Sequence, residues 1–82
     1  MKSTYDLLLC RWRAAQLVLA CRDRDSAQAA ALVGAMGVEG IAYIDAMAEV
    51  DLLAHEFARR PRCFLAAEVR RLAAKLNVGV TA

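Results

Sequence analysis

Residues 4–22 carry apolar side chains on two faces of a single helix, and this pattern constrains the fold more than any other feature of the chain. Both seams have the alternating three- and four-residue spacing of a helix face. Their members are Tyr5, Leu8, Trp12, Ala15 and Leu19 in one seam, and Leu7, Cys10, Ala14, Leu17 and Cys21 in the other. A helix with two apolar faces must be covered on both sides.

The composition indicates that the rest of the chain is helical too. Of 82 residues, 60% are hydrophobic and 18 are alanine, the strongest helix former. A domain of this size buries only about 60–65% of the surface that its unfolded chain exposes, so a partner covers apolar faces more easily than the chain itself does. We therefore expect an all-α, compact bundle of three to four short helices that forms an intertwined homodimer. Its expected interface consists of Leu8, Trp12, Ala15 and Leu19.

Three further helices are expected after residue 22. Asp25 followed by Gln28 fits an N-cap with its capping-box partner, and the helix that begins there should stop near Gly37. A third helix is expected to begin at residues 38–41 and to end at Pro61, which cannot continue a helix interior. The inner seam expected for this third helix is Tyr43, Met47, Val50, Ala54 and Phe57.

A fourth, basic and amphipathic helix is expected after Pro61. Asn77 and Gly79 can close it, which leaves residues 78–82 as a short tail. With one proline and four glycines there is no long flexible linker, so residues 1–82 are expected to form a single helical domain.

Charge is segregated along the chain although the net charge is only +2. Five acids and no Lys or Arg lie between Val38 and Ala58, whereas residues 59–75 hold six bases and the single acid Glu68. The acidic and basic helices can pair within the fold or across a dimer, or the bases can face a phosphate backbone or an acidic partner. The candidate contact residues are Arg59, Arg60, Arg62, Arg70, Arg71 and Lys75.

The residues able to carry chemistry are few. Cys10, Cys21 and Cys63 are odd in number and lack C-x-x-C spacing, which argues against a disulfide framework or a zinc site, and Cys10 and Cys21 are expected in the core. His55 follows Asp51 by four residues, a spacing that favours a surface ion pair over a catalytic pair. We therefore expect no enzymatic activity, no metal and no cofactor.

Two further expectations concern location. Charged residues interrupt the N-terminal region where a secretory signal needs an apolar run. The longest uncharged stretch, residues 26–38, is too short to span a bilayer. A cytoplasmic protein that makes no membrane contact is expected.

A resemblance to a known family extends over residues 5–65. Its residues are Tyr5-Asp6, Leu9, Ala15-Gln16, Asp25, Ala27, Ala29, Gly34, Glu39, Ile44, Ala46, Met47, Leu52 and Cys63. In this pattern the chain resembles the FlhD-type subunits of the bacterial flagellar master activator. The resemblance implies an intertwined homodimer that joins a second, DNA-contacting subunit to activate transcription. Cys63 would lie where that family can cross-link its two subunits.

Two functions are therefore weighed. The first is a small helical dimeric regulatory protein, a subunit or modulator of a bacterial transcription regulator, whose partners are a second copy, another protein subunit and, through the complex, DNA. The alternative is a non-catalytic adaptor or inhibitor, antitoxin-like, chaperone-like or phage-derived, that binds another protein.

Overall fold

Four helices make up the computed structural model, which describes the backbone of residues 3–81 and the side chains of residues 3–77. They are α1 (Thr4–Arg22), α2 (Ser26–Val38), α3 (Tyr43–Glu56) and α4 (Arg62–Thr81). No strand occurs within residues 3–81, so the expected all-α bundle is confirmed.

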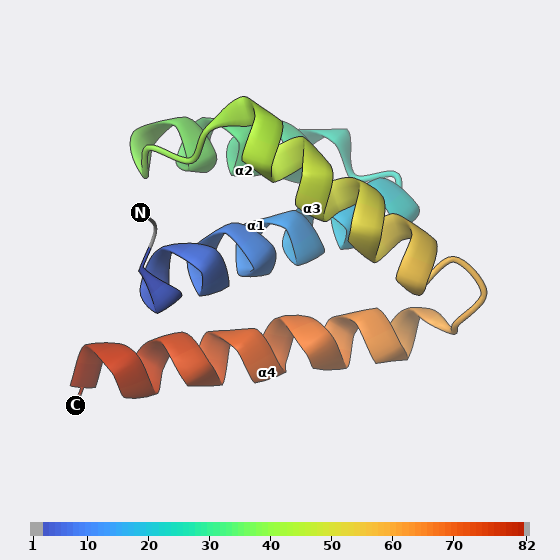
Figure 1. Ribbon diagram of the computed structural model, residues 1–82. Coiled ribbons are helices and arrows are strands. Elements are labelled where there is room, and N and C mark those ends of the chain that lie inside the picture. Colours follow the sequence, from blue (N-terminus) through green and yellow to red (C-terminus); the bar gives the residue numbers. More distant parts are fainter. Residues whose placement is uncertain (1–2, 82) are drawn as a thin grey trace.

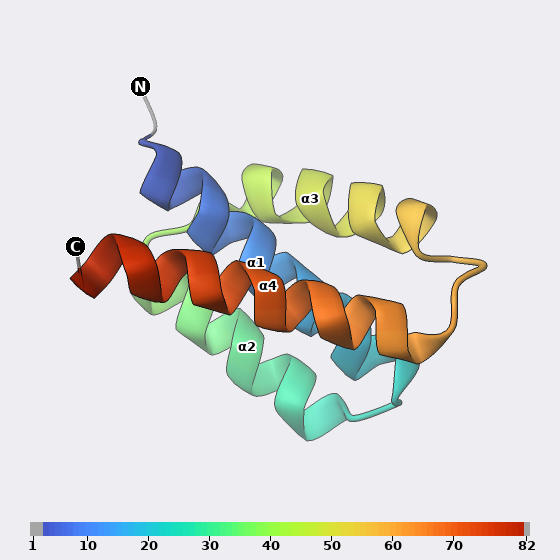
Figure 2. The same cartoon turned by 90° about the horizontal axis from the view of Figure 1, so that it is seen from below.

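Helix α1 is the centre of the bundle. Within the described residues, each of the other three helices packs against α1, and none of them packs against another. In Figure 1, α4 lies on one side of α1 while α2 and α3 lie on the other. The view from below separates α2 from α3 and places them to either side of α1 (Figure 2).

Small residues at the middle of α1 make this arrangement possible. Ala14 and Ala15 expose no surface, so neighbouring helices approach the α1 backbone closely from two directions. Leucine side chains of α3 and α4, and the phenylalanine that directly follows α3, belong to the same core cluster. The core consists of Ala14, Ala15, Val18, Leu53, Phe57, Leu65 and Leu72.

The side chains expected at the dimer interface belong to this core or pack against it. Ala15 is fully buried, and Leu8, Trp12 and Leu19 are partly buried against the core residues. The inference that a partner subunit must cover them is wrong, because three helices of the same chain surround α1. The homodimer stays a prediction, but these four residues are not needed to form it.

The first two helices begin at polar caps. The Ser3 hydroxyl accepts a hydrogen bond from the Asp6 N–H at 3.1 Å, and the Asp6 carboxylate accepts one from the Ser3 N–H at 3.3 Å. The predicted N-cap of α2 is confirmed, since the Asp25 carboxylate accepts from the Gln28 N–H at 3.1 Å. The expected capping box is not formed, because the Asp25 N–H bonds to the Ala20 carbonyl.

Two helix ends contain a residue with positive φ. After α2 this residue is Gly40 (φ 74°) rather than Gly37, because the helix continues past Gly37 before the chain reverses. The Ile41 N–H then bonds to the Met36 carbonyl and the Gly40 N–H to the Gly37 carbonyl, the pattern of a Schellman motif. Arg24 (φ 56°) takes the corresponding position after α1.

Helix α4 begins directly after Pro61, as the helix-breaking role of proline predicts. Its other end differs from the prediction. The helix continues to Thr81, so residues 78–81 of the expected tail are helical and Ala82 lies outside the described residues. A glycine inside a helix costs only about 1 kcal/mol relative to alanine, which does not force the helix to stop.

The buried face of α3 differs from the expected seam. Tyr43 and Ala54 are exposed, whereas Ala46 and Leu53 are buried together with Phe57. The exposed side of α3 therefore includes large apolar side chains. Within residues 3–81, no helix has the length and hydrophobicity that a membrane span requires.

Neighbouring leucines of α3 provide a direct test of this orientation. Leu53 is fully buried and Leu52 is 59% exposed. We expect Leu53→Ala to lower the free energy of unfolding by about 2–5 kcal/mol, because it leaves a cavity in the core. Leu52→Ala should change it by less than about 0.5 kcal/mol. Urea unfolding followed by circular dichroism measures both, and equal losses would contradict the buried face of α3.

Candidate protein-interaction surfaces

The outer side of α3 exposes a group of large apolar side chains. Tyr43 is 80% exposed, Ile44 77%, Leu52 59% and Met47 36%. Ile44, Ala48 and Leu52 follow one another at intervals of four residues, which places them in one row along the helix. We call Tyr43, Ile44, Met47, Ala48 and Leu52 the apolar α3 face. Single exposed apolar residues are ordinary, but a contiguous group on one helix is typical of an interaction surface.

One carboxylate interrupts the apolar α3 face. Asp51 is exposed and lies one turn after Met47. His55, one turn further on, does not form the expected ion pair with Asp51, and no other ion pair involves Asp51 in the described part of the chain. The apolar α3 face thus carries an unpaired acid beside Leu52, at its C-terminal end.

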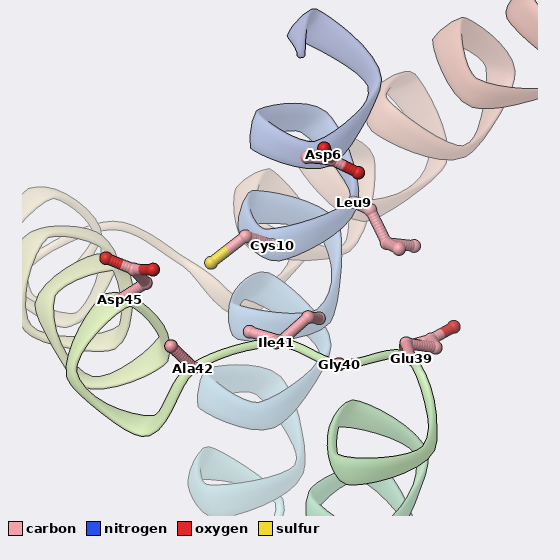
Figure 3. Close-up of a pocket in the computed structure, with 8 residues that line it drawn as sticks. All are labelled: Asp6, Leu9, Cys10, Glu39, Gly40, Ile41, Ala42 and Asp45. Carbon is pink, nitrogen blue, oxygen red and sulfur yellow. The ribbon is translucent and has the colours of Figure 1, made fainter. Parts of the chain in front are cut away.

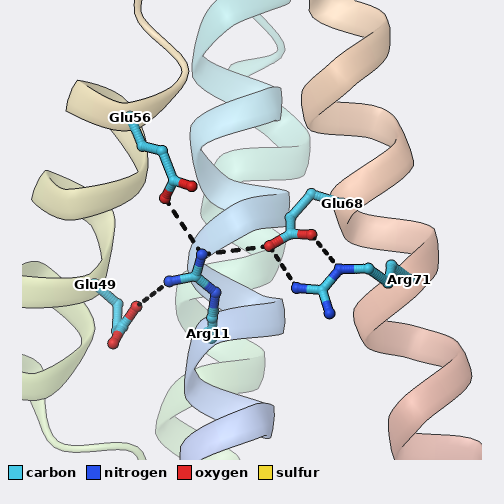
Figure 4. Close-up of polar contacts among 5 residues, drawn as sticks. All are labelled: Arg11, Glu49, Glu56, Glu68 and Arg71. Carbon is cyan, nitrogen blue, oxygen red and sulfur yellow. Dashed lines mark hydrogen bonds and ion pairs between the residues drawn. The ribbon is translucent and has the colours of Figure 1, made fainter.

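The inner acids of α3 are paired. Arg11 of α1 lies 3.4 Å from Glu49 and 3.3 Å from Glu56, both on α3, and 3.3 Å from Glu68 on α4. Figure 4 shows its guanidinium between the three carboxylates. Arg71 in turn donates two hydrogen bonds to Glu68, at 2.6 and 2.8 Å. We call these five residues the Arg11 cluster.

The Arg11 cluster shows that acidic and basic residues of different helices pair within the fold. The acids of α3 pair mainly with α1, and the one acid of α4 pairs with Arg11 and with its own neighbour Arg71. The Arg71 hydrogen bonds, followed by the contribution of Arg11, hold the pKa of Glu68 below its usual value against the opposing effect of burial. The Arg11 cluster therefore joins α1, α3 and α4 through ion pairs.

The predicted basic contact residues do not form one surface. Arg62 and Arg71 lie nine residues apart, which is two and a half turns of roughly 3.6 residues, so they are on opposite sides of α4. Arg62 donates to Asp23 at 2.6 and 2.8 Å, and Arg71 is held by Glu68. Bases that are close together in the sequence are therefore divided between different sides of α4.

The remaining basic contact residues fall into two groups. Arg60 lies over the Phe57 and Phe64 rings, at 5.6 and 6.0 Å from their centroids. No ion pair involves Arg59, Arg70 or Lys75 among the described residues. Arg59, Arg60 and Arg62 lie together, in the connection between α3 and α4 and at its junction with α4, whereas Arg71 and Lys75 lie one turn apart further along α4.

The structure adds two arginines that sequence reasoning missed. The connections from α1 to α2 and from α3 to α4 meet at the same end of the molecule in both views (Figures 1 and 2). Arg62 bonds to Asp23 there, and Arg22 donates to the Phe57 carbonyl at 3.3 Å. We call this group the arginine end; it comprises Arg22, Arg24, Arg59, Arg60 and Arg62. The sequence feature that indicates Arg22 and Arg24 is the run of alternating charge at residues 22–25.

Helix α2 presents a different kind of surface. It contains no charged residue, and its buried side chains are Leu32 and Met36. A Cβ added at Gly34 or Gly37 would meet nothing within 4 Å, so the outer side is open. Its exposed large apolar side chains are Val33, which is 57% exposed and lies next to the middle of the helix, and Val38, which is 91% exposed and lies at its end.

A cavity of about 230 Å³ lies between the first turns of α1 and the connection from α2 to α3. Figure 3 shows Cys10 and three carboxylates around it. Arg13 donates two bonds of 2.8 Å to Glu39, and the Asp6 carboxylate accepts a bond from the Ser3 N–H. Within residues 3–81, no group of three His, Cys, Asp or Glu side chains is placed to hold a metal ion.

The cysteines are divided between core and surface. Cys10 is buried, as predicted, but Cys21 is exposed, although its neighbour Ala20 is buried, so Cys21 lies on the outer side of the last turn of α1. Cys63 is exposed as well. An exposed thiol is what the predicted cross-link between two subunits requires.

Comparison of the chain with family models, curated proteins and solved structures finds no match.

The Arg11 cluster predicts a pH dependence of stability. Because the pKa of Glu68 is lowered in the folded protein, this carboxylate stabilises the fold above its unfolded pKa, ~4.3, and the stabilisation is lost as the pH falls through the folded value. Unfolding free energies of wild type and Glu68→Gln, measured from pH 7 downwards, should therefore converge below about pH 4. A difference that stays constant with pH would contradict the assignment.

Proposed function

We propose that this chain is a small helical regulatory protein of the cytoplasm, a subunit or modulator of a bacterial transcription regulator that acts through protein–protein contacts rather than catalysis. The apolar α3 face is the observation that carries the proposal. It exposes large apolar side chains that the core does not need, and such a surface is stabilised when a partner covers it. The alternative is a non-catalytic adaptor or inhibitor, which would use the same face.

The homodimer is part of the proposal. Its interface does not require the four α1 residues first expected, since Ala15 is fully buried and the other three pack against the chain's own core. The outer side of α2 is favourable for a second copy, because an isologous contact places the same patch on both sides and α2 has no charge to repel itself.

The oligomeric state can be measured by size-exclusion chromatography with light scattering, with and without reductant. We expect a dimer in both conditions. A dimer seen only without reductant, and lost in Cys63→Ser, would assign the link to the Cys63 thiol. A stable monomer in both conditions would contradict the homodimer.

Binding to DNA separates the regulator from the adaptor. If the arginine end contacts phosphates, the protein is retained on a duplex at low salt and released as salt rises, because counterions are displaced on binding. Arg59→Ala with Arg60→Ala should weaken this retention. The matched control is Arg70→Ala with Lys75→Ala, which removes the same charge from another part of the surface. Equal weakening by both pairs contradicts a contact through the arginine end, and no retention at all favours the adaptor.

A further inference from the structure

We infer that the apolar α3 face docks an amphipathic helix of a second protein, and that this helix carries a basic side chain opposite Asp51. The inference rests on the proposed function, action through protein contacts, and adds the chemistry of the partner. It comes from three properties of the face: its shape, its charge and its lack of a role in the core.

The shape of the face suits a helix. Ile44, Ala48 and Leu52 form a row in which a small residue lies between two large ones. A ridge of side chains from another helix can lie beside such a row at the usual interaxial distance of about 8–10 Å. Met47 and Tyr43 border the row on the same side, and all four large side chains are at least one-third exposed. The face is therefore long and narrow.

The charge of the face selects the partner. Helix α3 contains four acids and no Lys or Arg. Glu49 and Glu56 are engaged by Arg11 and Asp45 is half-buried at the cavity, so Asp51 is the exposed carboxylate beside the apolar side chains. Covering this carboxylate without a counter-charge would be strongly unfavourable, because it would lose its water and gain no partner. A Lys or Arg on the docking helix removes that penalty.

A second copy of this face is a poorer occupant. In an isologous contact, Asp51 would enter an interface whose other side carries the same acids and no Lys or Arg. A nucleic acid is excluded by the same reasoning, since its phosphates would approach an acidic surface. The charge of the face thus favours a basic helix over both.

Two synthetic peptides of about 18 residues, long enough to form helix, can serve as probes. Both carry the same leucine stripe and differ only in one residue beside the stripe, which is Arg in one peptide and Glu in the other. Fluorescence anisotropy with the full chain measures their affinities. We expect the Arg peptide to bind roughly tenfold or more tightly than the Glu peptide, as for other close charge pairs at interfaces.

Variants locate the contact. Ile44→Ser and Leu52→Ser should each weaken binding of the Arg peptide by roughly tenfold, whereas Val33→Ser on α2, a residue of similar exposure to Leu52, should leave it unchanged. Asp51→Lys should reverse the preference, so that the Glu peptide becomes the tighter ligand. Because these side chains are exposed, the variants should retain the helical content and unfolding midpoint of the wild type.

Each other outcome overturns a defined part of the inference. If Asp51→Lys leaves the preference unchanged, or the Glu peptide binds more tightly to the wild type, the basic partner is wrong while a protein-binding face remains. If neither peptide binds and Ile44→Asp converts a dimer into a monomer, a second copy covers the face. If neither peptide binds and the mass of the protein in solution is the same for Ile44→Asp as for the wild type, the face has no docking role. The proposed function then loses its support as well.

Discussion

Burial of α1 beneath three other helices is the constraint on which the rest of the structure depends. Since α2, α3 and α4 each pack on α1 and not on one another, the position of every surface element is set by which side of α1 it covers. Ala14 and Ala15 make this possible because they occupy little volume where neighbouring helices approach. Larger side chains at these positions would separate the helices and divide the core.

Electrostatics follows from the same geometry. Arg11 projects from α1 between α3 and α4, so it meets the acids on the inner flank of α3 and not those on the outer side. The acidic helix is thereby divided into a paired flank and an unpaired one. The chemistry proposed for the partner depends on this division, because without Arg11 the whole helix would present an undivided negative surface.

Local features of the fold were predictable from the sequence. The extent of α1, the Asp25 cap and the start of α4 after Pro61 depend on residues a few positions apart, and all three agree with the structure. The predicted bounds of the third helix were wrong, since α3 begins at Tyr43 rather than at residues 38–41 and ends at Glu56, before Pro61 is reached. The glycine that ends α2 was misplaced because both Gly37 and Gly40 can adopt positive φ, and only the point where the chain must turn decides between them.

The candidate surface was not predictable for a physical reason. On α3, the expected seam through Tyr43 and Ala54 and the observed face through Ala46 and Leu53 both have helical spacing, and both include Phe57. Residue spacing alone does not determine which of these two faces is buried, because that depends on where α1 lies and on which acids Arg11 reaches. The arginine end was missed similarly, since its members come from connections that are distant in the sequence.

The central position of α1 also affects how the chain is made. Helix α1 precedes all three of its partners in the sequence, so it leaves the ribosome while both of its seams are still uncovered. Leu65 and Leu72, which complete the core, are synthesised after most of the other helices. The nascent chain therefore exposes the Trp12 side of α1 to chaperones and to other nascent chains until α4 emerges.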